Sequence, residues 1–357
     1  MPKNPTFIVD RNKAIANLKK ISDKVKKHNL IFRPHFKTHQ SRIIGEWFKD
    51  FGINKITVSS LKMAKYFANS GWNDITIAFP LNLLEMEAIK LLSRKIKLSV
   101  LLTSIEAARV LYNSINALLG FYLEIDTGYH RSGILADDFK TIDNILKETD
   151  RNKYLKFKGF LTHAGDTYQA KSIVEIKKIH HIQLKKMKLL KAKYKERYPD
   201  IITSIGDTPT ISLLDNFEDI DEVRPGNFIF YDLMQFQLGV CRFEEIAVCV
   251  CCPVVDKSIS RNEIVIYGGA VHLSKESIKV NNKLNFGQVV KLLENYKWHQ
   301  PYSKAYVSSL SQEHGIITTT RELTEKINIG ECLGIIPVHS CLTANLSENF
   351  YIINNKK

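Results

Sequence analysis

Several features that would assign this chain to a special class of protein are absent. No uninterrupted apolar run reaches the roughly 18 residues that a membrane-spanning helix needs. The opening residues, MPKNPTFIVDRN, contain no apolar signal region. Hydrophobic residues make up 44% and charged residues 25% of the 357 positions, which excludes a disordered or collagen-like chain. We therefore expect a cytoplasmic globular protein with no membrane partner.

Cysteine is scarce and unevenly distributed. The six cysteines all lie in the last third of the chain, at positions 241, 249, 251, 252, 332 and 341. This pattern suits neither a secreted scaffold held by disulfides nor a zinc ribbon with paired CxxC motifs. We expect most of these residues to be reduced thiols in the core.

Acidic residues are in the minority. The chain has 51 Lys and Arg against 37 Asp and Glu, and the resulting net charge of +14 suggests nucleic acid, anionic membranes or acidic substrates as partners. The most basic segment is Lys177–Arg197, and an apolar stripe at helical spacing runs along it, formed by Ile176, Ile179, Met187, Leu190 and Tyr194. This pattern predicts an amphipathic helix with a solvated lysine face, on which His180 and His181 would be surface residues. No nucleic-acid module is visible, so we expect no nucleic-acid partner.

Short β-branched runs alternate with helical patterns through the first two-thirds of the chain. The expected strands are Leu30–Lys37, Lys55–Ser59, Asp74–Phe79, Lys97–Thr103, Phe121–Asp126, Phe157–His163, Ile202–Gly206 and Val223–Tyr231. The helical patterns between them include Arg42–Phe51, Leu61–Ser70, Leu81–Arg94, Ser104–Ser114 and Asp137–Glu148. We predict an α/β fold, a (β/α)8 TIM-type barrel over residues 10–235, with a doubly wound open sheet as the alternative.

The pattern changes after Tyr231, where short strands are separated by turns and long helical runs are few. The expected strands are Ala247–Val255, Glu263–Ile266, Gly287–Leu293, Lys304–Val307 and Gly334–Pro337. This texture predicts a β-rich second domain over residues 236–357, joined by residues 1–9.

Polar residues follow the predicted barrel strands, where barrel enzymes place their reacting groups. The first strand ends in RPHFKTHQ, which would put Lys37 and His39 at the rim. A single lysine at a strand end can merely extend its amine to water. A lysine that is desolvated at a barrel mouth beside other cations is instead activated as a nucleophile and proton carrier.

The ends of the seventh and eighth strands are rich in glycine and hydroxyl groups. They read SIGDTPT and VRPGNFIFYD, and Thr208, Gly226 and Asn227 are the candidates for binding a phosphate. Barrel phosphate sites commonly follow these two strands, although TPT and PGN are also ordinary turn sequences. A nucleophilic lysine with a phosphate pocket indicates pyridoxal 5'-phosphate.

Near the end of the chain, PVHSC at Pro337–Cys341 places His339 two residues before Cys341. In an extended segment both side chains would share one face, and imidazole with thiolate is a pair that favours zinc. A packed strand that binds no metal is the alternative.

The order of these motifs, RPHFKTH, DTGYHRSG, THAG, SIGDTPT, RPGNFIFYD and PVHSC, resembles the fold-type III pyridoxal-phosphate enzymes. It is most similar to the D-serine dehydratase and D-threonine aldolase group, which is related to alanine racemase. The resemblance covers Arg33 to Asn345, and RPHFKTH and HSC are its most discriminating pieces. It implies pyridoxal 5'-phosphate and Zn²⁺ as cofactors, and a homodimer.

The resemblance also implies roles for individual residues. Lys37 would carry the cofactor as a Schiff base and act as the catalytic residue, while His339 and Cys341 would bind the metal. The other cofactor residues would be Arg131 near the phenolic oxygen, His163 at the pyridine face, Tyr168 beside the site, Arg224 at the pyridine nitrogen, and Thr208, Gly226 and Asn227 at the phosphate.

The implied activity is a zinc-assisted lyase reaction on a D-3-hydroxyamino acid, with conversion of D-serine to pyruvate and ammonia as the first expectation. The His/Cys pair is similar to the D-serine dehydratase branch, whereas the D-threonine aldolase branch more often pairs His with Asp. Retro-aldol cleavage and amino-acid racemisation are alternatives. A non-enzymatic pyridoxal-phosphate carrier is a further alternative, but carriers of that type resemble the barrel alone.

Overall fold

The computed structural model describes residues 2–347 and 350–353. It contains two compact units. One comprises Lys20–Gly226, and the other combines Met1–Lys19 with Asn227–Lys357. No helix among the described residues is both long enough and apolar enough to cross a membrane.

The unit Lys20–Gly226 is built on eight parallel strands. Their order is β2-β10-β9-β8-β6-β5-β4-β3, and a parallel bridge between His35 and Thr57 joins the two ends of this order. The strands are β2 (Ile31–Phe32), β3 (Ile56–Val58), β4 (Asp74–Pro80), β5 (Lys97–Leu102), β6 (Leu119–Asp126), β8 (Leu155–Thr162), β9 (Ile202–Ile205) and β10 (Glu222–Val223), and the short β7 (Ile134–Leu135) pairs with β6. This topology confirms the predicted TIM-type barrel.

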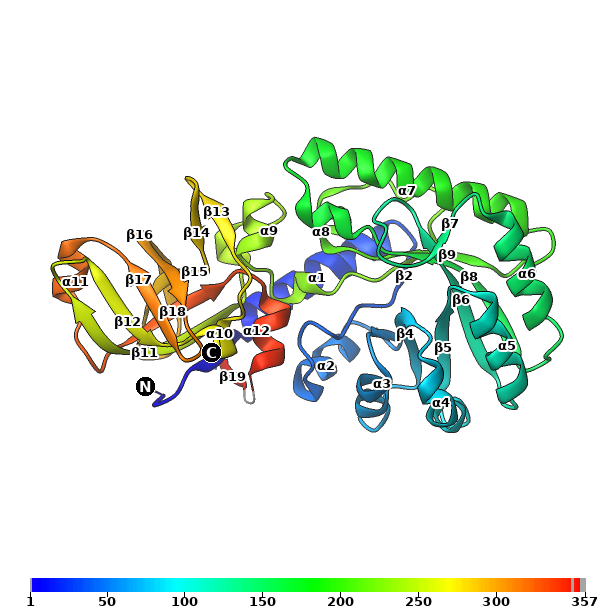
Figure 1. Cartoon of the computed structure of the whole chain (residues 1–357), viewed down its shortest axis with the longest axis horizontal. Coiled ribbons are helices and arrows are strands. Elements are labelled where there is room, and N and C mark those ends of the chain that lie inside the picture. The colour runs from blue at the N-terminus through cyan, green and yellow to red at the C-terminus, as the bar shows by residue number, and fades with distance from the viewer. Residues whose placement is uncertain (1, 348–349, 354–357) are drawn as a thin grey trace. The chain divides into compact units, whose positions relative to one another are not determined.

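Helices surround these strands (Figure 1). They are α1 (Arg11–Lys27), α2 (Arg42–Lys49), α3 (Leu61–Ala68), η1 (Leu83–Glu85), α4 (Met86–Ser93), α5 (Ile105–Ser114), α6 (Phe139–Thr149), η2 (Gly165–Gln169), α7 (Ile173–Tyr194) and α8 (Thr208–Leu213). Several begin after a side chain that accepts a backbone N–H of the first turn, as Ser60 and Ser104 do. Such caps satisfy donors that a helix leaves unpaired, and they fix where each helix begins.

The first and eighth strands are much shorter than the sequence predicted. β2 ends at Phe32 and β10 ends at Val223, because Pro34 and Pro225 follow and proline has no N–H for a sheet ladder. Each of these strands is followed by irregular backbone on the way to its polar residues. Lys37 therefore lies on a loop beyond a strand, and residues 227–229 form a 3₁₀ turn (η3).

The long basic helix α7 buries one face, as its apolar stripe predicted. Its buried residues are Ile176, His180, Gln183, Leu184, Met187, Leu190 and Tyr194. The expectation that His180 is a surface residue was wrong. Its Nε2 lies 2.6 Å from the carbonyl oxygen of Asn216, and burial lowers the pKa of this imidazole. His180 thus packs as a neutral, hydrogen-bonded core residue.

The second unit is rich in antiparallel strands. Six of them form a ring in the order β12-β17-β16-β15-β18-β11, which closes because β11 also pairs with β12. Two more, β1 and β19, extend the sheet beyond β11, and β13 pairs with β14. The strands are β1 (Thr6–Asp10), β11 (Val248–Ser258), β12 (Glu263–Tyr267), β13 (Ile278–Val280), β14 (Lys283–Asn285), β15 (Gly287–Leu292), β16 (Trp298–Leu310), β17 (His314–Thr318), β18 (Cys332–Pro337) and β19 (Phe350–Ile353).

Short helices complete this unit. They are η3 (Asn227–Ile229), α9 (Leu233–Gln237), η4 (Phe243–Glu245), α10 (Ala270–Leu273), α11 (Arg321–Lys326) and α12 (Ser340–Leu346). None of the six cysteines forms a disulfide in the described structure, and all except Cys332 are buried. This agrees with the expectation of reduced core cysteines.

Candidate active site

Lys37 and His39 lie close together in the chain but in different environments. Lys37 is exposed on the loop after β2, and its backbone N–H donates to Nδ1 of His35 at 3.3 Å. The expected desolvation of Lys37 is therefore not seen. His39 is fully buried, not at the rim, because its ring packs edge-on against Phe36 and stacks on Phe48. Burial lowers the pKa of His39 to about 3, so it is a neutral core residue.

His163 follows β8 and lies among cationic side chains. Its Nδ1 donates a short hydrogen bond to the carbonyl oxygen of Gly206, which leaves Nε2 as an acceptor in the neutral ring. Burial, and then the charges of Lys37 and Arg131, lower the pKa of His163 to about 3. The imidazole is therefore neutral at physiological pH.

His35 shares this surrounding, and sequence reasoning did not select it. Burial lowers its pKa well below the usual value, and Lys37, Arg224, His163 and Arg131 act in the same direction. Four of the predicted site residues thus lie close enough to influence one imidazole. We call Lys37, Arg131 and Arg224, with the two imidazoles whose pKa they lower, the cation cluster. Cations gathered around neutral rings favour an anionic ligand.

Arg224 is held rigidly within the cation cluster. Its Nη1 donates a short bond to the hydroxyl of Ser204, and its Nη2 donates to the carbonyl oxygen of Thr162 at 2.8 Å. Ser204 in turn donates to Glu222 Oε1 at 2.7 Å. Burial lowers the pKa of Arg224 to about 10 against the opposing charge of Glu222, so the guanidinium stays protonated at neutral pH.

Behind Glu222 stands a second buried arginine. Arg33 Nε donates to Glu222 Oε2 at 2.7 Å, and its Nη1 donates to Asp74. The sequence predicted Arg33 within a strand, but it did not indicate Glu222 as the partner of Arg33, because the two residues are 189 positions apart. The result is a continuous hydrogen-bonded chain through the barrel that fixes the orientation of Arg224.

The loop after β6 carries Arg131. Asp126 accepts from the backbone N–H groups of Gly128 at 2.8 Å and His130 at 3.1 Å, which folds the loop tightly. The exposed guanidinium of Arg131 lies 5.4 Å from the ring centre of Tyr129, whose edge faces the ring of His163. Tyr129 belongs to the DTGYHRSG motif, although neither the sequence nor the resemblance indicated a role for it.

The predicted phosphate pocket shows two features that fit a phosphate. Thr208 is fully buried, and its hydroxyl has no hydrogen-bond partner among the described residues. At Gly226 a Cβ atom would stand 2.7 Å from the carbonyl oxygen of His35, so only glycine fits that close approach. Tyr168 supports this corner, because its hydroxyl accepts the N–H of Thr208 at 3.1 Å. A buried hydroxyl beside the cation cluster suits the phosphate of pyridoxal phosphate.

Asn227 belongs to the second unit, where its amide nitrogen is engaged, whereas its buried Oδ1 has no hydrogen-bond partner among the described residues. The amide nitrogen lies 2.6 Å from Asp232 Oδ2, 3.1 Å from Ser340 Oγ and 3.6 Å from Cys341 Sγ. Asp232 Oδ2 also accepts the backbone N–H of Ser340 at 2.9 Å. The amide thus supports the segment that carries the predicted metal pair, while a role for Asn227 at the phosphate stays a prediction.

His339 and Cys341 do not lie in the extended segment that the sequence analysis assumed. The chain leaves β18 at Pro337, His339 is the residue before α12, and buried Cys341 lies in the first turn of that helix. The two side chains still meet. Burial opposes the charged imidazole, but Cys341, with Asp232 and Glu276, raises the pKa of His339 to about 9.

The donor chemistry of this pair suits zinc. Imidazole nitrogen and thiolate sulfur are common ligands of Zn²⁺, and the N–H of Asn227 would stabilise a thiolate at Cys341. In the part of the chain that the structure describes, no group of three His, Cys, Asp or Glu residues could hold a metal ion. A metal here would therefore have two protein ligands and open positions for small molecules.

Two family descriptions match consecutive parts of the chain. Residues 9–233 match "Alanine racemase, N-terminal domain", and residues 247–353 match "Putative serine dehydratase domain". D-serine dehydratase of Dictyostelium discoideum is 30% identical over 376 residues, covering 95% of this chain and 90% of that relative. D-threo-3-hydroxyaspartate dehydratase of a Delftia species is 26% identical over 356 residues, with 95% and 91% coverage.

A solved structure agrees with these sequence matches. The alanine racemase-like protein of Idiomarina loihiensis superposes with a TM-score of 0.89 at 28% identity. The match covers 98% of this chain and 94% of that one.

Proposed function

This chain belongs to the alanine racemase-like family of pyridoxal-phosphate enzymes, and on that basis we propose that it is a zinc-assisted lyase acting on a D-3-hydroxyamino acid. The reaction we favour converts D-serine into pyruvate and ammonia. The observation that carries the proposal is the cation cluster of Lys37, Arg131 and Arg224, with the unpartnered Thr208 hydroxyl beside it. An anionic cofactor and a carboxylate substrate both match that charge.

Pyridoxal phosphate, when bound, withdraws electrons from the α-carbon of an amino acid. Lys37 would hold it covalently, Thr208 and Gly226 would bind its phosphate, and His163 would face its ring. Arg224 would stand at the pyridine nitrogen, where the bonds from Arg224 to Ser204 and Thr162 keep the guanidinium in one position. Arg131 would lie near the phenolic oxygen, and Tyr168 would position Thr208 through its hydroxyl.

In this proposal Lys37 carries protons as well as the cofactor. An exposed amine on a loop can reach a substrate, and Lys37 Nζ would take the α-proton of the D-amino acid. The neutral rings of His35 and His163 would not compete for that proton, because the pKa of each lies far below neutrality.

The remaining chemical difficulty is the leaving group, because hydroxide departs poorly from carbon. A zinc ion held by His339 and Cys341 would act as a Lewis acid on the 3-hydroxyl of the substrate. The amide of Asn227, donating toward Cys341 Sγ, would keep that sulfur in its thiolate form. In our proposal this His/Cys donor set promotes elimination of water. The relatives that are named dehydratases and match nearly the whole chain support this choice of reaction.

A panel of substrates tests the proposal. Purified protein supplied with pyridoxal phosphate and Zn²⁺ should form pyruvate and ammonia from D-serine and should leave L-serine unchanged. Glycine and acetaldehyde from D-threonine as the main products would indicate a retro-aldol lyase. Racemisation of D-alanine without keto acid would indicate a racemase. Failure of every substrate, with cofactor bound, would favour the carrier alternative and overturn the proposal.

The metal part is tested separately. Removal of Zn²⁺ by a chelator should abolish pyruvate formation while the protein keeps its pyridoxal phosphate, and added Zn²⁺ should restore it. Pyruvate formation that is unchanged in metal-free protein would contradict the role of His339 and Cys341.

Homodimeric assembly and a cytoplasmic location stay predictions from the sequence.

A further inference from the structure

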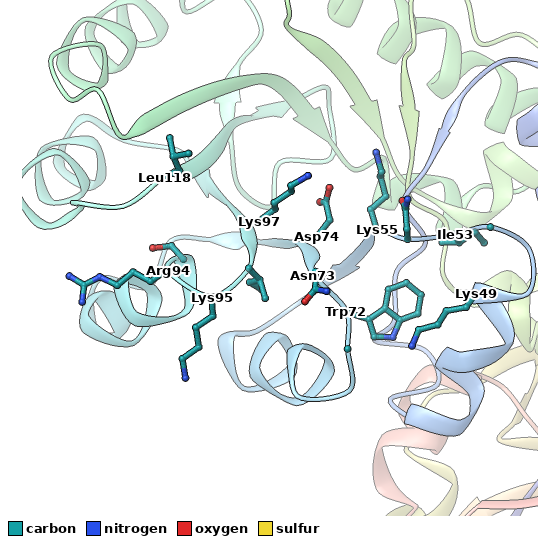
Figure 2. A pocket seen from close by; sticks show the side chains of 15 residues that line it. Lys49, Ile53, Lys55, Trp72, Asn73, Asp74, Arg94, Lys95, Lys97 and Leu118 are labelled. Atoms are coloured by element: carbon teal, nitrogen blue, oxygen red, sulfur yellow. The ribbon is translucent and has the colours of Figure 1, made fainter.

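The barrel unit has a large hollow at the end of its strands opposite to Lys37. It lies where β3, β4 and β5 begin, and it has a volume of about 890 Å³. Its cationic lining consists of Lys49, Lys55, Arg94, Lys95 and Lys97, and Asp74 is the only carboxylate among the lining residues. Figure 2 shows these side chains around the hollow, which we call the basic pocket. The proposed lyase reaction uses none of the cationic lining residues, and only Asp74 among the residues named here also belongs to the hydrogen-bonded chain that supports Arg224.

Most of the positive charge in the basic pocket is not neutralised by the protein. Lys55, Lys95 and Lys97 form no ion pair with any residue that the structure describes. The single carboxylate, Asp74, is already engaged by Arg33. Lys49 pairs with Glu46 at 2.8 Å on the surface. Like charges that surround a hollow repel one another, and an anion in the hollow would relieve this repulsion.

The walls of the basic pocket also include apolar surface. Half-buried Ile96 and Leu118, which is 70% exposed, contribute this surface, whereas the lining residues Ile53 and Trp72 are buried. An inorganic anion would leave that surface in water. An anion that carries a flat apolar body would cover it, and the volume of the hollow lies within the usual range for pockets that bind small organic molecules.

We propose that the basic pocket binds a nucleotide, in which a phosphate chain meets Lys55 and Lys97 and the base covers the apolar wall at Leu118. Lys55 precedes β3 and Lys97 begins β5, so β4, which begins at Asp74, lies between them, and their amines rise on either side of Asp74 (Figure 2). Each charge-assisted bond to a phosphate strengthens binding by more than a neutral bond does. This site is separate from the proposed cofactor phosphate site, which follows β9 and β10 at the opposite ends of the barrel strands.

Calorimetric titration of the holoenzyme with ATP tests this proposal, because bound pyridoxal phosphate blocks the other phosphate site. We expect saturable binding of one ATP per chain that weakens as salt is added. The double variant Lys55→Gln/Lys97→Gln should weaken binding at least about tenfold. The matched variant Lys62→Gln/Lys65→Gln, which removes the same charge from the exposed face of α3, should change it less than about twofold.

A second variant tests the apolar wall independently. Leu118→Glu adds a carboxylate at an exposed position, so folding should be retained and ATP binding should again fall about tenfold or more. The proposal would be overturned by an absence of saturable ATP binding, or by equal losses in the two double variants. It would also be overturned if inorganic phosphate bound as tightly as ATP, or if a single-stranded RNA oligonucleotide bound more tightly.

Discussion

The side-chain amide of Asn227 donates toward the sulfur of Cys341 across 3.6 Å, although 114 positions separate the two residues. Asn227 ends the segment that the sequence analysis assigned to the cofactor phosphate, whereas Cys341 belongs to the predicted metal pair. The amide is buried and also contacts Asp232 and Ser340, so its position is fixed. We infer that Asn227 would position Cys341 as a metal ligand.

Replacement of Asn227 tests this role. Asn227→Ala should weaken zinc binding by about 10- to 100-fold, because removal of a group that supports a metal ligand typically has an effect of this size. Competition with a chromophoric chelator measures zinc affinity without any enzyme assay. Asn328→Ala, at an exposed asparagine of the same unit, serves as the control and should keep the wild-type affinity. Equal zinc affinities of all three proteins would contradict the assignment.

The buried hydroxyl of Thr208 gives a second prediction. Thr208→Val keeps the shape of the side chain but removes the hydroxyl, so the affinity for pyridoxal phosphate should fall about tenfold. Thr76→Val is a matched control, since Thr76 is equally buried and its hydroxyl also lacks a partner among the described residues. Fluorescence titration of apoprotein with pyridoxal phosphate compares them. The phosphate assignment is wrong if the two variants bind alike.

The buried pair of Arg33 and Glu222 gives a prediction about stability. Arg33→Ala would leave Glu222 buried without its partner, which should lower the free energy of unfolding by about 3–5 kcal/mol. Arg197→Ala removes an arginine that pairs with Asp150 in solvent, and should lower it by about 0–1 kcal/mol. Urea unfolding of both variants measures the contrast. A loss of less than about 1 kcal/mol in Arg33→Ala would show that the barrel tolerates Glu222 without its ion pair to Arg33.

Asp207, which caps α8, gives a prediction about pH. Burial raises the pKa of Asp207 from 3.8 to about 6, despite the hydrogen bonds from Thr210 and Thr167. The folded state therefore holds this proton more tightly than the unfolded state does. The protonated carboxyl of Asp207 therefore makes its full contribution to the free energy of unfolding below about pH 4. As the pH rises to about 6, this contribution of about 3 kcal/mol is lost.

Asp207→Asn should remove this pH dependence while it keeps the helix cap, because asparagine caps as well as aspartate. The variant should therefore gain stability relative to the wild type as the pH rises from 4 to about 6.5. Urea unfolding at several pH values measures the difference. A constant difference across this range would mean that Asp207 titrates near its ordinary pKa in the folded protein.

The barrel was predictable because each strand is a short apolar run and each helix shows its own periodicity. The polar end of the first strand predicted Lys37, whereas the roles of Arg131, His163 and Arg224 came from the family resemblance and stay predictions. In the structure Lys37, Arg131 and Arg224 lie close enough to lower the pKa of His163 and His35. Neighbouring parallel strands end at one edge, so residues that are distant in sequence meet there. The β-rich domain after residue 231 was predictable because its strands are also short runs, separated by turns.

Features that depend on a distant partner were not predictable. Nothing near Arg33 in the sequence indicates Glu222, and nothing near Asn227 indicates Cys341. Single histidines were also misplaced. His39 and His180 are both buried, because packing against aromatic rings or a backbone carbonyl decides the position of one imidazole and leaves no periodic signal. Pro34 and Pro225 were visible in the sequence, and their effect on strand length was underestimated.

The central claim is that Lys37 carries the cofactor and moves the α-proton, and one comparison tests it most directly. Wild-type protein supplied with pyridoxal phosphate and Zn²⁺ should show a visible absorbance band of protein-bound cofactor and should convert D-serine to pyruvate. Lys37→Ala should lose the band and at least about a hundredfold in rate. Lys62→Ala, at an exposed lysine of α3, should keep both. Pyruvate formation by Lys37→Ala at the wild-type rate would contradict the account.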